Sequence, residues 1–256
     1  LVPAENIFIL TNHLQEAEVR RQAAELPAEN IVAEPARRDT APAVALGVGL
    51  IAARDPQANM IIIPSDSLIL DDNAFRALAE DALSLAGREA ALITIGIKPT
   101  WACPSYGYIE RAGKLEDATL THNCYEVVRF REKPDAATAA GYLASGNFSW
   151  NAGMFIARAS VFRAAFATHA PSLSALAQGS FKTTRLKSVY EQLEKISFDY
   201  AVMEKLSRVE VVKGDFGWDD VGSFLAFERH YGKDAGGNVT YGEVNAVDSS
   251  GNIIIA

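Results

Sequence analysis

The sequence predicts an α/β layered fold built around a largely parallel sheet, followed by a short all-β segment. Two observations support this prediction. Apolar runs of strand length alternate along the chain with stretches of helical spacing, which is the pattern of a sheet covered by helices. Beyond about residue 234 the chain becomes rich in Gly, Asn and Ser, with short β pieces and no helical spacing. We therefore expect one domain over residues 1–233 and the start of a second, all-β segment over residues 234–256.

Six short runs are predicted to be strands because they are rich in β-branched residues and mostly apolar on both faces. In chain order, these runs are residues 6–10, 59–66, 90–97, 126–134, 151–157 and 209–216. The stretches with helical spacing are residues 13–26, 40–55, 72–87 and 135–146. Asp72 is expected to cap the third of these helices, and Gly87 to end it.

The composition narrows the class of protein. The chain has 256 residues, of which 49% are hydrophobic and 22% charged, so it can bury a sizeable core. Its formal net charge of −8 argues against non-specific binding to nucleic acid or anionic lipid. No apolar run is long enough for a membrane-spanning helix, and the first residues lack the pattern of a signal peptide. Cys103 and Cys124 are expected to be reduced thiols in a cytoplasm.

Several catalytic classes have no support in the sequence. It contains neither a G-x-G-x-x-G after a strand nor a G-x-x-x-x-G-K-[ST], so neither a dinucleotide site nor a P-loop is expected. The four histidines are scattered without metal-ligand spacing and without a nucleophile partner. A hydrolase triad is therefore unsupported.

Carboxylates follow predicted strands at the end of the sheet where α/β proteins bind ligands. Asp66 follows one strand, and Asp219 and Asp220 follow another. Asp66 and one of that pair could hold Mg²⁺, which takes one or two protein carboxylates and fills its other positions with phosphate oxygens and water. The alternative is that Asp66 and Asp72 only start turns or cap helices.

Glu132 and Lys133, at the exit of another predicted strand, have two interpretations. A solvated ion pair is common on surfaces and contributes little. A functional pair would place the ammonium on a substrate phosphate and the carboxylate on sugar hydroxyls. Pro134 ends the strand there and holds the pair at the edge of the sheet.

Seven segments together resemble one family. They are EPARRDTAPA (34–43), PSD (64–66), YGYIE (106–110), FREKPD (130–135), WNAGMF (150–155), FDYAVMEK (198–205) and GWDDVGS (217–223). Their order and spacing are similar to those of the mannose-1-phosphate guanylyltransferases, or GDP-mannose pyrophosphorylases, a branch of the sugar-nucleotide nucleotidyltransferases. The resemblance covers nearly the whole chain. It implies a Rossmann-like nucleotidyltransferase fold with a mixed, mainly parallel sheet.

The resemblance also implies a role for the first segment, where a short strand ends in Glu34 and Pro35. Guanine presents two adjacent donors, its ring N–H and its exocyclic amine, and one carboxylate can accept from both. A wrong base would leave that carboxylate unpaired, which is a strong basis for rejection. Glu34 is thus the expected guanine contact, beside Pro35, Arg38 and Thr40. Arg38 either acts near the nucleotide or orders the loop, and Asp39 stands where the family usually has Asn.

The reaction implied by the resemblance is the Mg²⁺-dependent transfer of GMP from GTP to mannose 1-phosphate, giving GDP-mannose and pyrophosphate. Asp66 and Asp220 would hold the metal, because Asp220 rather than Asp219 fits the family's W-x-D-x-G spacing. The implied mannose pocket consists of Tyr106, Gly107, Glu132, Asn151 and Asp199, with Lys133 on the mannose phosphate. Family members often associate through the C-terminal β segment, so a homodimer is expected.

The family's opening Gly-rich loop, L-A-G-G-x-G-x-R-x-W-P-L-S, has no counterpart in this sequence. We expect that an N-terminal strand and this triphosphate-binding loop are missing from it. Two alternatives to the guanylyltransferase stay open. One is a catalytically silent, nucleotidyltransferase-like regulatory subunit that binds sugar nucleotides. The other is a nucleotidylyltransferase for another hexose 1-phosphate such as glucose 1-phosphate, against which Glu34 is the distinguishing feature.

Overall fold

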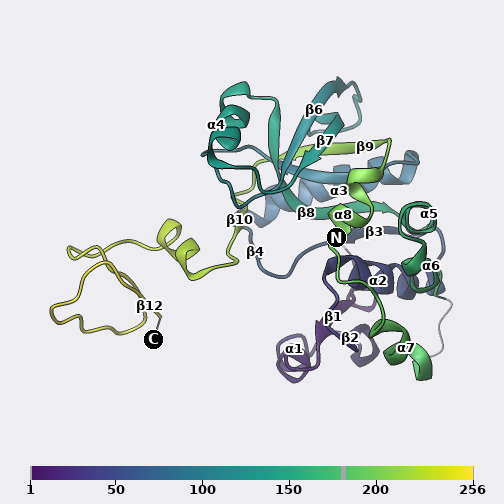
Figure 1. Ribbon diagram of the computed structural model, residues 1–256, viewed down its shortest axis with the longest axis horizontal. Coiled ribbons are helices and arrows are strands. Elements are labelled where there is room, and N and C mark those ends of the chain that lie inside the picture. The colour runs from purple at the N-terminus through teal and green to yellow at the C-terminus, as the bar shows by residue number, and fades with distance from the viewer. Residues whose placement is uncertain (1, 180–182, 256) are drawn as a thin grey trace. The chain divides into compact units, whose positions relative to one another are not determined.

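The computed structural model describes residues 2–179 and 183–255, which form two compact units. The larger unit comprises residues 1–63 and 76–214, and the smaller one residues 64–75 and 215–256. The larger unit contains a mixed sheet flanked by helices (Figure 1), so the predicted α/β layered fold is confirmed. No helix in the described part of the chain is long and apolar enough to cross a membrane.

The main sheet of the larger unit has six strands in the order β3-β8-β5-β9-β7-β6, and β6 also pairs with β8. In that order, the strands span Asn59–Ile62, Phe148–Arg158, Leu92–Ile97, Val209–Gly214, Cys124–Arg131 and Tyr108–Leu115. Every residue of β5 is buried, as its apolar residues on both faces predict. By contrast, Cys124 is the only buried residue of β7, and the other seven are half-buried or exposed.

The expectation of a mainly parallel sheet is wrong. Among the described residues of this sheet, only β5 and β9 pair in parallel, and the other pairings are antiparallel. The physical reason lies in two elements. Strands β6 and β7 are consecutive and form an antiparallel pair without a crossover helix. The long strand β8 runs against β3, β5 and β6, so each of its pairings is antiparallel.

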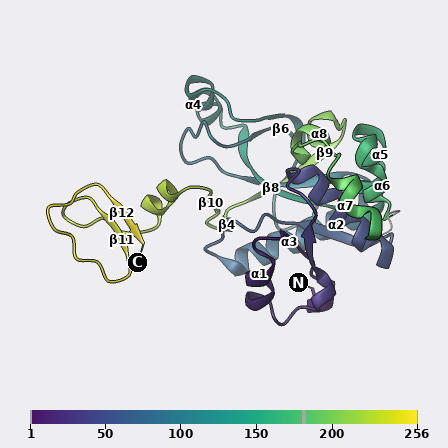
Figure 2. The same ribbon diagram turned by 60° about the horizontal axis from the view of Figure 1, so that its bottom comes forward.

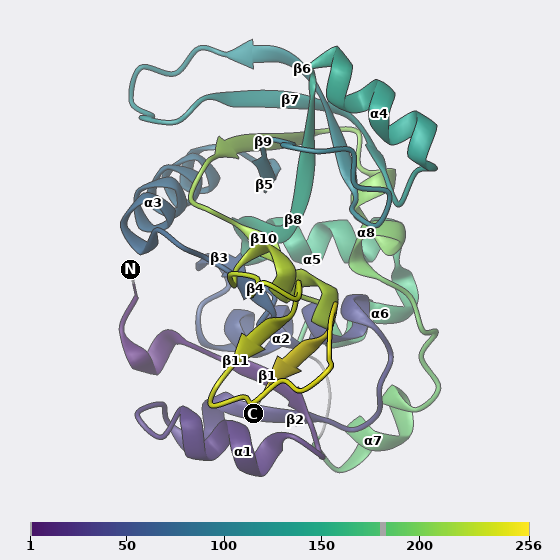
Figure 3. The same cartoon turned by 90° about the vertical axis from the view of Figure 1, so that its left-hand side faces the viewer.

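Helices cover the two faces of this sheet differently. Helices α2 (Thr40–Arg54), α5 (Ala159–His169), α6 (Pro171–Ala177) and α8 (Phe198–Ala201) share one hydrophobic core with residues of β3, β5, β8 and β9. Residues of α3 (Asp72–Arg88) do not belong to that core, and Figure 3 shows α3 on the other side of the sheet from α5. Helices α2 and α6 touch through backbone at Gly49, where an added Cβ would lie 2.0 Å from the carbonyl oxygen of Leu176.

Most of the predicted helices and strands are present, with shifted ends. The predicted helices correspond to α1 (Glu16–Gln22), α2, α3 and α4 (Ala136–Ser145). Asp71 rather than Asp72 caps α3, because Oδ1 of Asp71 accepts hydrogen bonds from the backbone N–H groups of Asn73 and Ala74. Among the described strands and α-helices of the larger unit, those not predicted are β6, α5, α6, α7 (Thr183–Tyr190) and α8.

Two further strands of the larger unit form a separate parallel pair. They are β1 (Ile9–Asn12) and β2 (Ile31–Glu34), in register from Ile9 opposite Ile31 to Asn12 opposite Glu34. No strand among the described residues joins this pair to β3. The pairing places Glu34 at the carboxyl end of β2, directly before the loop that leads into α2.

The smaller unit has two short β pairs. Strands β4 (Ser67–Leu68) and β10 (Asp219–Asp220) are antiparallel. After the 3₁₀ helix Phe224–Arg229, strands β11 (Val239–Tyr241) and β12 (Ile253–Ile255) run side by side and parallel (Figure 2). The prediction of short β pieces without an α-helix beyond about residue 234 is confirmed for the described residues.

Candidate functional site

A polar cluster forms around Gly107 in the larger unit, from four segments distant in the sequence. Gly107 precedes β6, Glu132 follows β7, Asn151 lies in β8, and Asp199 lies in α8. The backbone N–H of Asn151 donates to the carbonyl of Gly107 at 2.8 Å, and its Nδ2 donates to Oδ1 of Asp199 at 2.8 Å. A Cβ on Gly107 would lie only 2.7 Å from Oε2 of Glu132. The fold thus brings together four of the residues that the sequence analysis placed in a sugar pocket.

The amide of Asn151 is oriented by its surroundings. Its Oδ1 accepts from the backbone N–H of Gly153 at 3.1 Å, and the hydroxyl of buried Thr94 lies 3.5 Å from the same oxygen. With Oδ1 used in this way, Nδ2 points to Asp199. The result is a fixed amide beside two carboxylates, which is an arrangement suited to a ligand rich in hydroxyl groups.

The two carboxylates of this cluster influence each other. Burial is the main cause that raises the pKa of Asp199 to about 6. The hydrogen bond from Asn151 opposes this shift, and the negative charge of Glu132 adds to it. Lys133 supplies a nearby cation, since its Nζ lies 3.4 Å from Oε1 of Glu132 and its side chain is 67% exposed.

Lys133 and Tyr106, the other two residues predicted for the sugar and phosphate site, differ in their backbone conformation and packing. Lys133 adopts a positive φ of 44°, which is uncommon for a residue with a side chain. Tyr106 is buried, and its ring packs edge-on against Trp150 at 5.1 Å between ring centroids. Tyr106 therefore supports the turn before Gly107 by packing.

Glu34 forms a second polar site in the larger unit. Its side chain is half-buried, and its Oε2 accepts a hydrogen bond from the hydroxyl of Tyr190, at the end of α7. Burial raises the pKa of Glu34, and the bond from Tyr190 acts in the opposite direction. Within the described ranges, Tyr190 is the residue that donates a hydrogen bond to this carboxylate.

The loop between β2 and α2 is tied to the segment that follows α7. The guanidinium of Arg38 donates from Nε to the carbonyl of Tyr190 at 3.3 Å, and from Nη2 to the carbonyl of Glu191. The hydroxyl of Thr40 accepts from the backbone N–H of Phe198 at 2.8 Å. Of the two roles left open for Arg38, these contacts support loop ordering.

The remaining residues of this loop have local roles. Pro35 directly follows β2 and is half-buried. Asp39 has a φ of 67° and caps α2, accepting from the N–H of Thr40 at 2.8 Å. Because Phe198 precedes Asp199, its bond to Thr40 also connects this loop to the polar cluster around Gly107.

The two predicted metal ligands lie in the smaller unit. The pairing of β4 with β10 sets Asp220 opposite Ser67, next to Asp66. Asp220 is half-buried, and its Oδ1 accepts from the N–H of Gly222 at 2.9 Å, whereas Asp66 is exposed. Asp219 is buried and accepts from Nε of Arg229 at 2.8 Å, with Nε2 of His230 at 2.6 Å. The carboxylate of Asp219 is therefore bound by Arg229 and His230. Asp220 lies opposite Ser67, which directly follows Asp66 in the sequence.

The donor set of Asp66 and Asp220 fits a hard divalent ion, because carboxylate oxygens are the ligands that such ions prefer. No group of three or more His, Cys, Asp or Glu side chains suited to a metal occurs among the described residues. The other ligands would then come from phosphate oxygens and water, as is usual for Mg²⁺.

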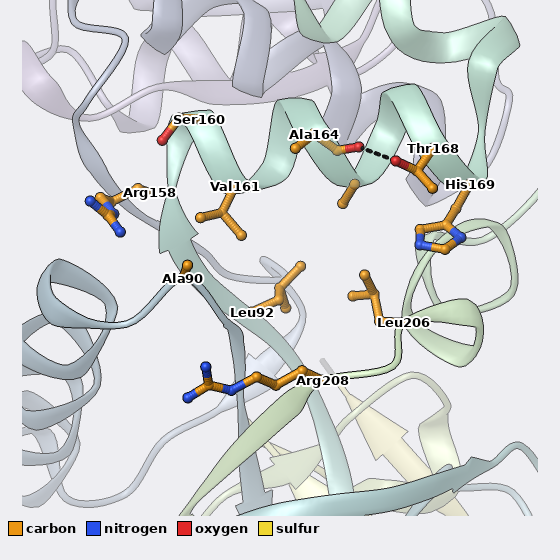
Figure 4. A pocket seen from close by; sticks show the side chains of 11 residues that line it. Ala90, Leu92, Arg158, Ser160, Val161, Ala164, Thr168, His169, Leu206 and Arg208 are labelled. Atoms are coloured by element: carbon orange, nitrogen blue, oxygen red, sulfur yellow. Dashed lines mark hydrogen bonds between the residues drawn. The ribbon is translucent and has the colours of Figure 1, made fainter.

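A cavity of about 400 Å³ lies elsewhere in the larger unit and contains none of the predicted site residues. It is formed between α5 and the beginnings of β5 and β9, with Leu92, Val161 and Leu206 facing its interior (Figure 4). Arg158 and Arg208 line one end, and Arg208 is already paired with Glu89 and Glu210. Ligands of α/β sheets bind at the carboxyl ends of parallel strands. Since this cavity lies at the beginnings of the parallel strands β5 and β9, we do not take it as the candidate site.

Sequence reasoning missed Tyr190. No local motif marks it, because the residue that it contacts is 156 positions away and α7 was not predicted. Its signal is visible only in the fold, where a fully buried tyrosine must find a partner for its hydroxyl.

Both a family model and curated relatives match nearly the whole of this chain. The family model described as nucleotidyl transferase matches residues 2–235. A mannose-1-phosphate guanylyltransferase from Sinorhizobium fredii is 34% identical over 97% of this chain and 50% of its own length. The xanthan biosynthesis protein XanB from Xanthomonas campestris is 36% identical over 95% of this chain and 51% of its own. The chain thus spans about half the length of the curated relatives it matches.

Solved structures support the fold. A structure from Thermus thermophilus, described as a mannose-1-phosphate geranyltransferase, has a TM-score of 0.84 and 35% identity, covering 100% of this chain and 75% of that one. A mannose-6-phosphate isomerase from Helicobacter pylori has a TM-score of 0.68 and 27% identity, covering 83% of this chain and 84% of that one.

Proposed function

The chain belongs to the nucleotidyl transferase family, and from this premise we propose that the full-length protein transfers GMP from GTP to mannose 1-phosphate, giving GDP-mannose and pyrophosphate. Relatives named mannose-1-phosphate guanylyltransferase support this choice of substrates. The structural observation that carries the proposal is the polar cluster of Glu132, Asn151 and Asp199 around Gly107. It offers fixed acceptors and a donor to the hydroxyls of a hexose.

The proposed reaction is a phosphoryl-group substitution. A phosphate oxygen of mannose 1-phosphate attacks the α-phosphorus of GTP and forms a new P–O bond. The bond from that phosphorus to the bridging oxygen of the β-phosphate breaks, and pyrophosphate leaves with the electron pair. A phosphate monoester is already largely ionised near neutral pH, so no general base is needed. The protein's task is to position two anions and to neutralise charge.

In this proposal the larger unit recognises both substrates. The carboxylates of Glu132 and Asp199 accept hydrogen bonds from mannose hydroxyls, and Lys133 contacts the mannose phosphate. Gly107 contributes by lacking a side chain, because a Cβ there would lie 2.7 Å from Oε2 of Glu132 and would crowd that carboxylate. The carboxylate of Glu34 accepts from the ring N–H and the amine of guanine.

Asp66 and Asp220 would hold Mg²⁺ in the smaller unit. When bound, the ion supplies positive charge that neutralises phosphate oxygens. Gly222 orients Asp220 by donating its backbone N–H to Oδ1. We also propose that the protein is cytoplasmic, where the buried thiol of Cys124 would stay reduced. A homodimer stays a prediction, which sedimentation of the full-length protein would test.

The test is pyrophosphate release by the full-length protein with mannose 1-phosphate and each of the four nucleoside triphosphates, with and without Mg²⁺. We expect Mg²⁺-dependent release with GTP well above the others. Glu34→Gln should reduce kcat/KM for GTP about tenfold to a hundredfold, because a hydrogen bond to a charged group contributes ~1.5–3 kcal/mol.

Glu29→Gln is the matched control, since Glu29 is an exposed carboxylate before β2. It should leave nucleotide preference unchanged. Binding of GDP-mannose without release from any triphosphate would instead identify a silent regulatory subunit. Unchanged GTP preference in Glu34→Gln would contradict the role of Glu34.

A further inference from the structure

Tyr190 is a buried polar residue whose hydroxyl meets the candidate base-recognition carboxylate. Its side chain is fully buried in the core that α2, α5 and α8 share. From there its hydroxyl donates a hydrogen bond to Oε2 of Glu34. Burying a tyrosine in this way costs free energy unless the hydroxyl finds a partner, and here that partner is the side chain of Glu34.

Arg38 holds Tyr190 in place. Its guanidinium donates to the carbonyl oxygens of Tyr190 and Glu191, while its own carbonyl accepts from the N–H of Ile196 at 3.3 Å. The N–H of Ala41 in turn donates to the carbonyl of Ile196 at 3.1 Å. The loop between β2 and α2 is therefore hydrogen-bonded both to the end of α7 and to Ile196, which follows it in the chain.

The contact has a consequence for base recognition. A carboxylate oxygen has two lone pairs, so Oε2 can accept from Tyr190 and from one further donor, while Oε1 can accept from another. The donated bond fixes the rotation of the carboxylate. It also stabilises the ionised form against the effect of burial, which raises the pKa of Glu34. An ionised, fixed carboxylate is the form that can accept from two adjacent donors of a purine.

We propose that Tyr190 is a positioning residue for base selection, which orients the Glu34 carboxylate toward a 2-amino-6-oxopurine while Arg38 fixes Tyr190. This inference rests on the proposed role of Glu34 in recognising guanine. Tyr190 itself does not touch the nucleotide. Its effect should therefore appear in the choice between bases and should vanish when Glu34 is replaced.

The experiment compares GTP with ITP, whose base lacks the exocyclic amine, in the full-length protein. Tyr190→Phe removes the hydroxyl and keeps the ring that fills the core. We expect the ratio of kcat/KM for GTP to that for ITP to fall about tenfold, mainly through a higher KM for GTP, since GTP loses one more hydrogen bond than ITP. Tyr142→Phe, which removes a hydroxyl from α4 and keeps the ring stacked on Phe148, should leave the ratio unchanged.

A double-mutant cycle separates this inference from its premise. Adding Tyr190→Phe to Glu34→Gln should cause no further loss of selectivity, because the hydroxyl acts through Glu34. An equal loss of turnover with GTP and ITP in Tyr190→Phe would show a merely structural role and overturn the inference. An unchanged ratio in Tyr190→Phe, together with lost selectivity in Glu34→Gln, would overturn it while leaving the proposed function intact. Unchanged selectivity in Glu34→Gln would contradict both the role of Glu34 in guanine recognition and the positioning role of Tyr190.

Discussion

Replacing Asp199 by Asn should stabilise the folded protein near neutral pH and change how its stability depends on pH. Asp199 is a carboxylate that burial disfavours in its ionised form, so its pKa lies at about 6 instead of 3.8. Below about pH 4 the carboxyl is protonated in both the folded and the unfolded state. Between about pH 4 and pH 6 the folded state holds a proton that the unfolded state releases, so stability falls as the pH rises.

The magnitude follows from the shift. One pKa unit corresponds to about 1.4 kcal/mol, so the ionised Asp199 side chain destabilises the folded state by up to about 3 kcal/mol above pH 6. The amide introduced by Asp199→Asn would not titrate, and its Oδ1 could still accept the hydrogen bond that Asn151 donates. The advantage of this variant over the native protein should therefore grow by about 2–3 kcal/mol between pH 4 and pH 7.

Urea unfolding of both proteins at half-unit steps of pH would measure this difference. Asp117→Asn is a control of opposite sign, because the hydrogen bond from the Thr119 side chain lowers the pKa of Asp117. Its difference from the native protein should be constant between pH 4 and pH 7. A difference for Asp199→Asn that is also constant over this window would refute the assigned ionisation. The stabilised variant should bind mannose 1-phosphate more weakly, since the amide lacks the charge and one acceptor oxygen.

Two further predictions concern the substrate sites. Gly107→Ala should raise KM for mannose 1-phosphate about tenfold, because the methyl group would displace the Glu132 carboxylate. KM for GTP should not change, and Gly141→Ala, with open space around it in α4, should be neutral in both assays. An unaltered KM for mannose 1-phosphate would contradict this arrangement. Arg38→Lys should lower the free energy of unfolding by about 1–2 kcal/mol, because lysine cannot span the carbonyls of Tyr190 and Glu191. Urea unfolding would measure this change. A raised KM for GTP at unchanged stability would instead indicate that Arg38 contacts the nucleotide.

Local patterns in the sequence were sufficient for the fold class and for most buried strands. Burial on both faces of β5 agrees with the mostly apolar residues on its two faces. The direction of the strands did not follow, because alternation of strands and helices does not say which strands pair. The six-stranded sheet is mostly antiparallel owing to the β6–β7 pair and to β8, which lies between β3 and β5.

For the candidate site too, the sequence predicted individual residues, whereas the fold shows how they are arranged. Glu34, Glu132, Asn151 and Asp199 could be named from local motifs, but only the fold shows that the last three lie together. The different environments of Asp219 and Asp220 depend on the side chains of Arg229 and His230, which contact the carboxylate of Asp219. Neighbouring residues in a strand point to opposite faces, so adjacent positions in the sequence can have unrelated partners.

Sequence by itself determined the α/β class, the buried strands and the chemical types available at their ends, because these depend on residue character and short-range spacing. Only the tertiary structure decided that Tyr190 meets Glu34 across 156 positions, and that the guanidinium of Arg38 donates to backbone carbonyls. Such contacts depend on which distant segments the core brings together, and burial then requires each enclosed polar group to find a partner. No local pattern carries that information.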